Sequence, residues 1–239
     1  MATSSGLTTF RRAARPLALT ALSFFLAGFL ASPTARAERP ERVRTTDQSL
    51  GVENPRNDKE QALERLTDVR DALEAGASGV GDPETALQEL DDAIEELEES
   101  LDPEFWVRDE EGDIDGLHLD PEDGHHVFHE ERHAAQEIFD AIVMGEIEDV
   151  DLREELLAIV DVLAAADGRL AEIAIEDALE AGSDPEEIEE ALEQLFRGDD
   201  LVEKAAGQAN LALKAAHFYT AMDRAYRHAW QEAIEASGS

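Results

Sequence analysis

The stretch Asp82–Leu101, D-P-E-T-A-L-Q-E-L-D-D-A-I-E-E-L-E-E-S-L, shows how this chain builds its fold. Asp82 is a typical N-cap, because its carboxylate can accept hydrogen bonds from the free N–H groups of a first helical turn. Pro83 suits the first helical position, and Glu84 lies near the positive end of the helix dipole. Apolar residues then recur three or four positions apart, at Leu87, Leu90, Ile94, Leu97 and Leu101. The stretch therefore predicts an amphipathic helix.

The same combination of helix caps and helical spacing of apolar residues continues along the chain. Asp-Pro-Glu recurs as a helix start, at Asp82, Asp102, Asp120 and Asp184. Helical spacing of apolar residues predicts helices over 58–76, 125–144, 151–166, 170–181, 186–196 and 199–236, with a break or bend at Gly168. No segment shows sustained strand alternation. These patterns predict an all-α fold, an antiparallel bundle of about six to seven helices with an acidic loop in the middle.

The first residues have the pattern of an export signal. Three arginines within 11–15 precede an apolar core, Leu17–Leu30, and Ala35-Arg36-Ala37 offers a small-x-small cleavage site. We expect residues 1–37 to be a signal peptide cleaved after Ala37, which implies a secreted or periplasmic protein. The alternative is an uncleaved anchor, for which the core is short, since a membrane span needs about 20 apolar residues.

The remaining chain divides by composition into four parts. Residues 38–57 have little periodicity and are expected to be a flexible leader. Residues 58–101 predict an N-terminal helical hairpin, and 102–124 an acidic loop. Residues 125–236 predict a C-terminal helical bundle.

Composition narrows the function. The chain has no cysteine, which excludes disulfides, thiolate metal sites and a thiol nucleophile. Its 57 acidic and 20 basic residues give a formal net charge of −37, a balance that resembles proteins from salty habitats. Such a surface repels nucleic acid and anionic membranes, so we expect neither as a partner, and no stable membrane insertion after cleavage. It attracts cations and basic proteins, and a homo-oligomer is a further expectation.

The acidic loop contains E-G-D-I-D-G-L-H-L-D-P-E, which is close to a calcium-loop pattern. Its oxygen ligands would be Glu111, Asp113, Asp115, the main-chain carbonyl of Leu117, and Glu122. Two departures weaken the match: Glu stands at the first position, where Asp is usual, and His118 stands at an ordinarily apolar position. The alternative is a solvated acidic loop.

A histidine cluster follows the loop. His129-Glu130-x-x-His133 matches the zinc-protease pattern, but the charged spacer Glu131-Arg132 disfavours a buried catalytic helix. His126, His129 and His133 share one flank of a helix, which predicts a surface site for zinc or another divalent transition metal. His217 and His228 could complete that site. The alternative is a polar helix face. The opposite, mostly apolar face carries Phe128, Glu131, Ala135, Phe139 and Ile142.

Part of the chain, about residues 152–218, resembles the carboxymuconolactone decarboxylase and alkylhydroperoxidase-D-like helical family. The resemblance is carried by Leu156–Val160, Ala164–Leu170 and Asp177–Leu192, where a helix ends in Ala-Gly and the next starts with Pro-Glu-Glu-Ile. It implies a helical, often oligomeric fold.

The redox members of that family carry a C-x-x-C-x-x-x-H motif. In register, its positions are occupied here by Asp167, Leu170 and Ala174. No catalytic residue carries over, so the resemblance implies no peroxidase activity.

Together these features predict an exported, strongly acidic, all-helical protein without enzymatic activity that binds calcium-like cations or a basic partner. No complete set of catalytic residues is recognisable in the sequence. One alternative is a metal-dependent enzyme that uses His126, His129 and His133. Another is a structural helical oligomerisation module.

Overall fold

The structure is a computed structural model that describes residues 54–76 and 78–238. The predicted signal peptide, residues 1–37, and most of the predicted leader lie outside the described residues. The helices are α1 (Pro55–Glu74), α2 (Pro83–Ser100), α3 (His125–Met144), α4 (Val150–Ala181), α5 (Pro185–Ala206), α6 (Leu211–Thr220) and α7 (Arg227–Gly238). A π-helical turn, Ala221–Tyr226, joins α6 to α7, so these two form one continuous helix. The predicted all-α class is confirmed.

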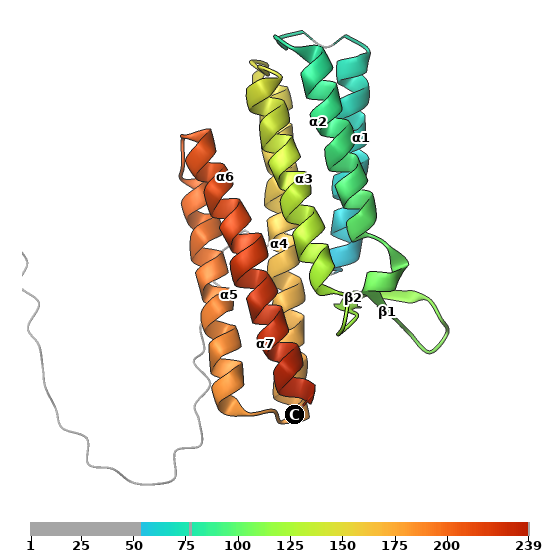
Figure 1. Cartoon of the computed structure of the whole chain (residues 1–239), viewed down its shortest axis with the longest axis vertical. Helices are drawn as coiled ribbons and strands as arrows, with labels where there is room; N and C mark the ends of the chain where they lie inside the picture. Colours follow the sequence, from blue (N-terminus) through green and yellow to red (C-terminus); the bar gives the residue numbers. More distant parts are fainter. Residues whose placement is uncertain (1–53, 77, 239) are drawn as a thin grey trace, which may run out of the picture. The chain divides into compact units, whose positions relative to one another are not determined.

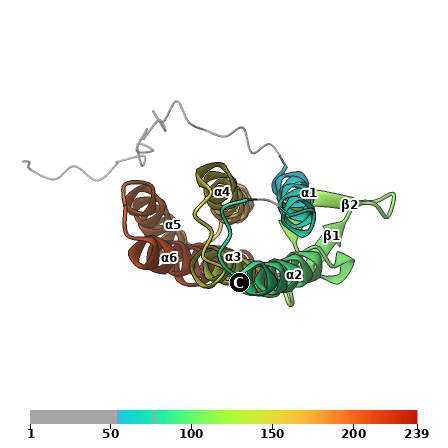
Figure 2. The ribbon, with the colours of Figure 1, turned by 90° about the horizontal axis from the view of Figure 1, so that it is seen from above.

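The helices lie in two layers. Figure 1 shows them running side by side, and Figure 2 shows α1, α4 and α5 in one layer and α2, α3 and α6 in the other. Short turns join α1 to α2, α3 to α4, and α5 to α6, so that consecutive helices are antiparallel. The turn before α2 contacts the turn after α3, where the N–H of Asp82 donates to the carbonyl of Gly145 at 3.0 Å.

Two of the four Asp-Pro-Glu sequences start α-helices. Asp102 precedes only a three-residue 3-10 turn, and the helix start predicted at Asp120 is wrong because α3 begins at His125. Asp82 accepts a hydrogen bond from the N–H of Thr85, and Asp184 accepts one from Glu186, as their Asp-Pro-Glu sequences predict. Asn54 caps α1 in the same way, so this helix begins at Pro55. The boundary predicted between leader and hairpin was therefore wrong by three residues, because Asn54-Pro55 is itself a cap followed by Pro at the first helical position.

The predicted break at Gly168 is wrong. Helix α4 runs without interruption from Val150 to Ala181. Gly168 is there for close packing instead, because a Cβ at this position would lie 3.2 Å from Cζ of Tyr226. The predicted last helix, 199–236, is also wrong, because α5 ends at Ala206 and a separate turn precedes α6.

The acidic loop contains a small antiparallel sheet that the sequence did not predict. Strand β1 (Trp106–Arg108) pairs with β2 (Ile114–Leu119), with Trp106 opposite Leu119. Both side chains are buried, and the indole N–H of Trp106 donates to the carbonyl of Ser100 at 3.0 Å. The base of the loop is thus anchored on the bundle.

Two groups of buried apolar side chains form the core. The first joins α1, α2, α3, the first half of α4 and α6, with Leu66, Leu90 and Ile138 among its members. The second joins the β-hairpin of β1 and β2, the second half of α4, α5 and α7, and it includes Leu170 and Trp230. The predicted hairpin, 58–101, therefore shares its core with the later helices. None of the helices in the described ranges is both long enough and apolar enough to cross a membrane.

Candidate functional site

The predicted calcium ligands lie along the β-hairpin and the turn after it. Glu111 and Asp113 are exposed near the hairpin tip, and Glu122 is exposed in the turn before α3. The carboxylate of Asp115 accepts hydrogen bonds from the backbone N–H groups of Leu117 at 2.8 Å and His118 at 3.0 Å. Within the described ranges, the groups of three or more carboxylates or imidazoles that come together include none of these residues.

Strand β2 lies close to the start of α1 at Gly116. Gly116 has a positive φ of 72°, and a Cβ there would lie 2.6 Å from Oδ1 of Asn54. Asn54 also donates to the carbonyl of Asp115. Strand β2 therefore contacts the start of α1. Calcium binding by these residues stays a prediction.

The predicted histidine cluster lies along the outer flank of α3. His126 stacks on Phe105, with ring centroids 5.5 Å apart, while His129 and His133 are neighbours at 4.4 Å. Burial lowers the pKa of His133, and the nearby Arg132 adds to this effect. Among the described residues, no close group of three ligands contains these imidazoles, nor His217 or His228. The transition-metal site likewise stays a prediction.

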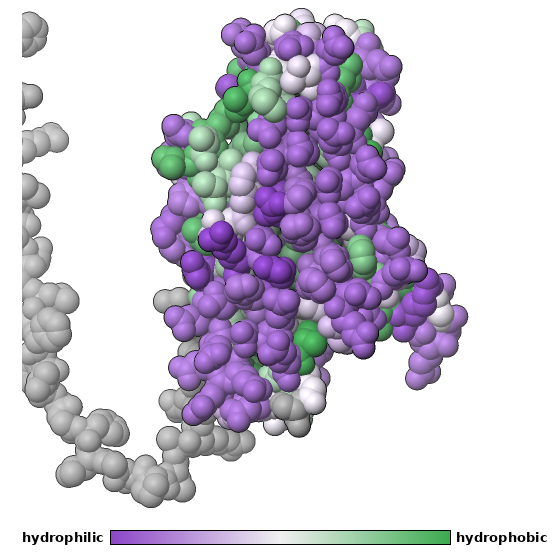
Figure 3. All heavy atoms as spheres, in the orientation of Figure 1, coloured by the Kyte–Doolittle hydropathy of each residue, from purple (hydrophilic) through white to green (hydrophobic). Residues whose placement is uncertain are grey.

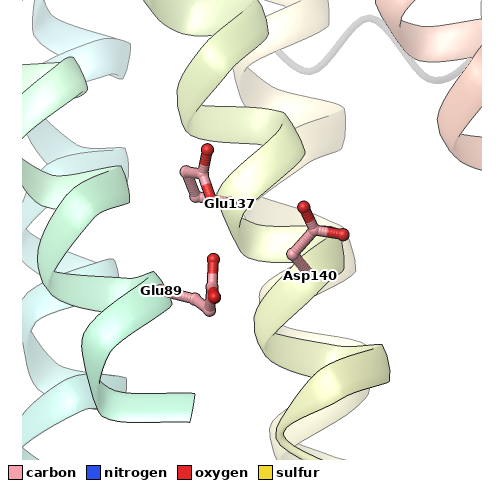
Figure 4. Close-up of side chains that lie close together, drawn as sticks. All are labelled: Glu89, Glu137 and Asp140. Atoms are coloured by element: carbon pink, nitrogen blue, oxygen red, sulfur yellow. The ribbon is translucent and has the colours of Figure 1, made fainter. Parts of the chain in front are cut away.

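Carboxylates do gather where α2 packs on α3. We call this the α2–α3 carboxylate seam, and its members are Glu89, Glu96 and Glu99 of α2 with Glu130, Glu137 and Asp140 of α3. They form two groups of three, and in each group one oxygen per residue lies within 4.8 Å of the others. Figure 4 shows Glu89 projecting from α2 toward α3, which carries Glu137 and Asp140.

Two carboxyl groups in the first group of the seam have raised pKa values. Burial and a hydrogen bond with Glu89 raise the pKa of Glu137 to about 7, and the charges of Asp140 and Asp92 add to the effect. Burial also raises the pKa of Asp140, with the charge of Glu89 as the second cause. At pH 7 the carboxyl group of Glu137 is therefore protonated in about half of the molecules.

The second group of the seam behaves in the same way. Burial and a hydrogen bond with Glu130 raise the pKa of Glu96 to about 7. His133 and His129 oppose this shift, and Nδ1 of His133 lies 3.8 Å from Oε1 of Glu96. The histidine flank of α3 thus borders one end of the seam.

A second ionisable cluster lies inside the bundle. Lys59 of α1, Glu131 of α3 and Asp167 of α4 are completely buried. The ammonium of Lys59 lies 2.5 Å from Oε1 of Glu131 and 2.9 Å from Oδ1 of Asp167. Burial alone would lower the pKa of Lys59, but the two carboxylates outweigh it and hold this pKa above its usual value. The lysine is therefore charged.

Two carboxyl groups beside one ammonium need not both be ionised. Burial, followed by the charge of Asp167, raises the pKa of Glu131 well above its usual range. A proton on Glu131 lets it hydrogen-bond to Asp167, and the three side chains then carry no net charge. This cluster joins three helices and is closed to solvent.

Sequence reasoning missed both clusters as sites. Glu131 was placed on the mostly apolar face of its helix, but it was also interpreted as part of a charged spacer that disfavours burial, and this interpretation is wrong because Glu131 is completely buried. Lys59 is in helical phase with Ala62, Leu66 and Val69, and this phase was the available signal. The seam gave no comparable signal, because pairs across α2 and α3 arise only from packing.

Comparisons with known proteins add no assignment. No family model matches the chain, and no curated protein or solved structure gives a significant match. The resemblance to the carboxymuconolactone decarboxylase family stays a prediction.

Proposed function

We propose that this protein is an exported, non-catalytic helical bundle that binds calcium-like divalent cations at the α2–α3 carboxylate seam. The observation that carries the proposal is the group Glu89, Glu137 and Asp140, where three half-buried carboxyl groups from two packed helices crowd together. Without a cation, the crowding is relieved by holding a proton, as the raised pKa of Glu137 indicates. A divalent cation would relieve it better, because carboxylate oxygens are its preferred ligands.

Several observations support a binding role over a catalytic one. A shallow hollow at the α4–α5 turn contains no histidine, and its carboxylate, Asp184, caps α5. The buried cluster of Lys59 is closed to any substrate. The alternative of a metal-dependent enzyme rests on His126, His129 and His133, which lie along one flank of α3. Among the described residues, neither group of three possible metal ligands contains any of these histidines.

Calcium titration calorimetry on the protein without residues 1–37 tests the proposal. We expect binding with a Kd of the order of 10⁻⁴–10⁻³ M, the range of weak extracellular calcium modules. The variant Glu137→Gln removes one ligand charge and should weaken binding at least about tenfold, which corresponds to about 1.4 kcal/mol. Glu64→Gln is the matched control, since Glu64 is exposed on α1 and belongs to neither group.

Two results would contradict the proposal. One is the absence of heat at millimolar calcium, and the other is equal affinity in the Glu137→Gln and Glu64→Gln variants. Binding of polylysine without binding of calcium would transfer the role to a basic protein partner.

A further inference from the structure

Two histidines of α3 lie beside the carboxyl groups at one end of the seam. His129 and His133 are one helical turn apart, and their ring centroids are separated by 4.4 Å. Nδ1 of His133 lies 3.8 Å from Oε1 of Glu96 on α2. The charges of both histidines oppose the rise in the pKa of Glu96, which places both imidazoles near this carboxyl group. Glu96 thus has imidazole as well as carboxyl neighbours.

The spacing along both helices accounts for this arrangement. Glu130 and His133 are three residues apart on α3, as are Glu96 and Glu99 on α2, and side chains with this spacing lie on the same face of a helix. Because α2 packs on α3, the two faces meet, and one oxygen each of Glu96, Glu99 and Glu130 lies within 4.8 Å of the others. Hydrophilic side chains cover this side of α2 and α3 in Figure 3. Two neighbouring helices therefore bring oxygen and nitrogen donors to one place.

His126 has different neighbours, although it lies on the same flank of α3. Its ring stacks on Phe105, with ring centroids 5.5 Å apart, and the ring of His125 lies 4.2 Å away. The histidine flank is thus divided into two pairs, and it is the pair His129 and His133 that adjoins Glu96.

We propose that His129, His133 and Glu96, with Glu130 beside them, form a site for a divalent transition metal such as zinc. Two histidines one turn apart can bind a single zinc ion, as in the H-E-x-x-H pattern, and a carboxylate is a usual further ligand. The imidazole nitrogens select zinc over calcium, which takes oxygen ligands. His129 is exposed and the side chains of His133 and Glu96 are half-buried, so rotation about their side-chain bonds can bring the ligand atoms to one ion.

This zinc site is separate from the proposed calcium group. None of its ligands belongs to the group Glu89, Glu137 and Asp140. The inference therefore goes beyond the proposed function and does not rest on it, because either ion can bind without the other. Zinc should bind in the presence of excess calcium, since calcium does not compete for nitrogen donors.

Titration calorimetry with zinc chloride on the protein without residues 1–37, with calcium in excess, tests the inference. We expect one zinc ion per molecule. His133→Ala and Glu96→Gln should each weaken zinc binding at least about tenfold, because the loss of even an outer partner of a metal ligand costs about that much. His126→Ala is the matched control and should bind zinc as tightly as the unmodified protein. In nuclear magnetic resonance spectra, zinc should shift the imidazole signals of His129 and His133 and leave those of His126 in place.

Circular dichroism would confirm that each variant is folded, which is expected because none of the replaced side chains is completely buried. The absence of zinc binding in the unmodified protein would overturn the inference, and so would equal zinc affinity in His133→Ala and His126→Ala. Glu137→Gln separates the two sites, because it should weaken calcium binding and leave zinc binding unchanged. Equal loss of zinc binding in Glu137→Gln and Glu96→Gln would contradict the ligand set. Failure of calcium binding alone would contradict only the proposed function.

Discussion

Lys59 is one of only three lysines in the sequence, and it is completely buried between Glu131 and Asp167. A buried cluster of oppositely charged side chains stabilises a fold only weakly, because the cost of desolvation offsets most of the attraction between the charges. Removing one member is different, since it leaves a buried charge without its partner. The cluster therefore favours the arrangement of α1, α3 and α4 in which all three side chains meet.

Replacing Lys59 with Met should destabilise the protein by about 3–5 kcal/mol, because Glu131 and Asp167 lose their shared cation. Urea unfolding measures the change. Lys204→Met is the control, since Lys204 pairs with Asp200 at the surface with 55% of its side chain exposed, and we expect an effect within about 0.5 kcal/mol. Similar losses in both variants would show that the buried pairing has no special importance.

The sequence indicates parts of this cluster but not their meeting. Glu131 and Lys59 each interrupt an apolar stripe, so an unusual burial could be suspected at both positions. Their separation of 72 residues, and the 108 residues between Lys59 and Asp167, carry no local signal. Which ionisable groups share one interior is decided by helix packing.

The contact between α2 and α3 is the element on which the proposed function depends. Leu90, Ala93 and Leu97 of α2 are buried in the core, while Glu89 and Glu96 lie at the border of the same interface. Their partners Glu137 and Glu130 project from α3. Apolar packing thus holds like-charged groups close together, and the strain of that arrangement is relieved by protons.

This arrangement makes stability depend on pH in a defined direction. The pKa values of Glu96 and Glu137 rise from 4.5 to about 7 on folding, so the native state holds protons that the unfolded chain releases. The stabilisation of the native state by these bound protons is complete below pH 4.5 and is lost as pH rises through about 7. The free energy of unfolding in urea should therefore fall between pH 5 and pH 8. The Glu137→Gln variant should show a shallower fall than Glu64→Gln, and a rise with pH would contradict the assignment.

The elements themselves were largely predictable. Caps such as Asp82 and Asp184 fixed helix starts, because their chemistry is local. The prediction at Gly168 failed because a glycine can have two roles that look alike in sequence. It can interrupt its own helix, or it can make room for a side chain of another helix, as Gly168 does for the ring of Tyr226. The β-hairpin was missed because β1 has only three residues, too few to show alternation.

At the scale of the whole molecule, charge and fold act together. The 57 acidic and 20 basic residues make the surface attractive to cations and repellent to a second copy. Export, proposed from residues 1–37, would bring the seam into contact with extracellular or periplasmic cations.

The central claim is that a divalent cation replaces the protons held at the seam. Calcium titrations at pH 7 in two buffers of different ionisation enthalpy measure the number of protons released. Because the pKa of Glu137 is about 7, we expect about half a proton per calcium from that carboxyl group, with affinity that rises from pH 6 to pH 8. The Glu137→Gln variant should lose this release. Calcium binding with no proton release and no pH dependence would contradict the account.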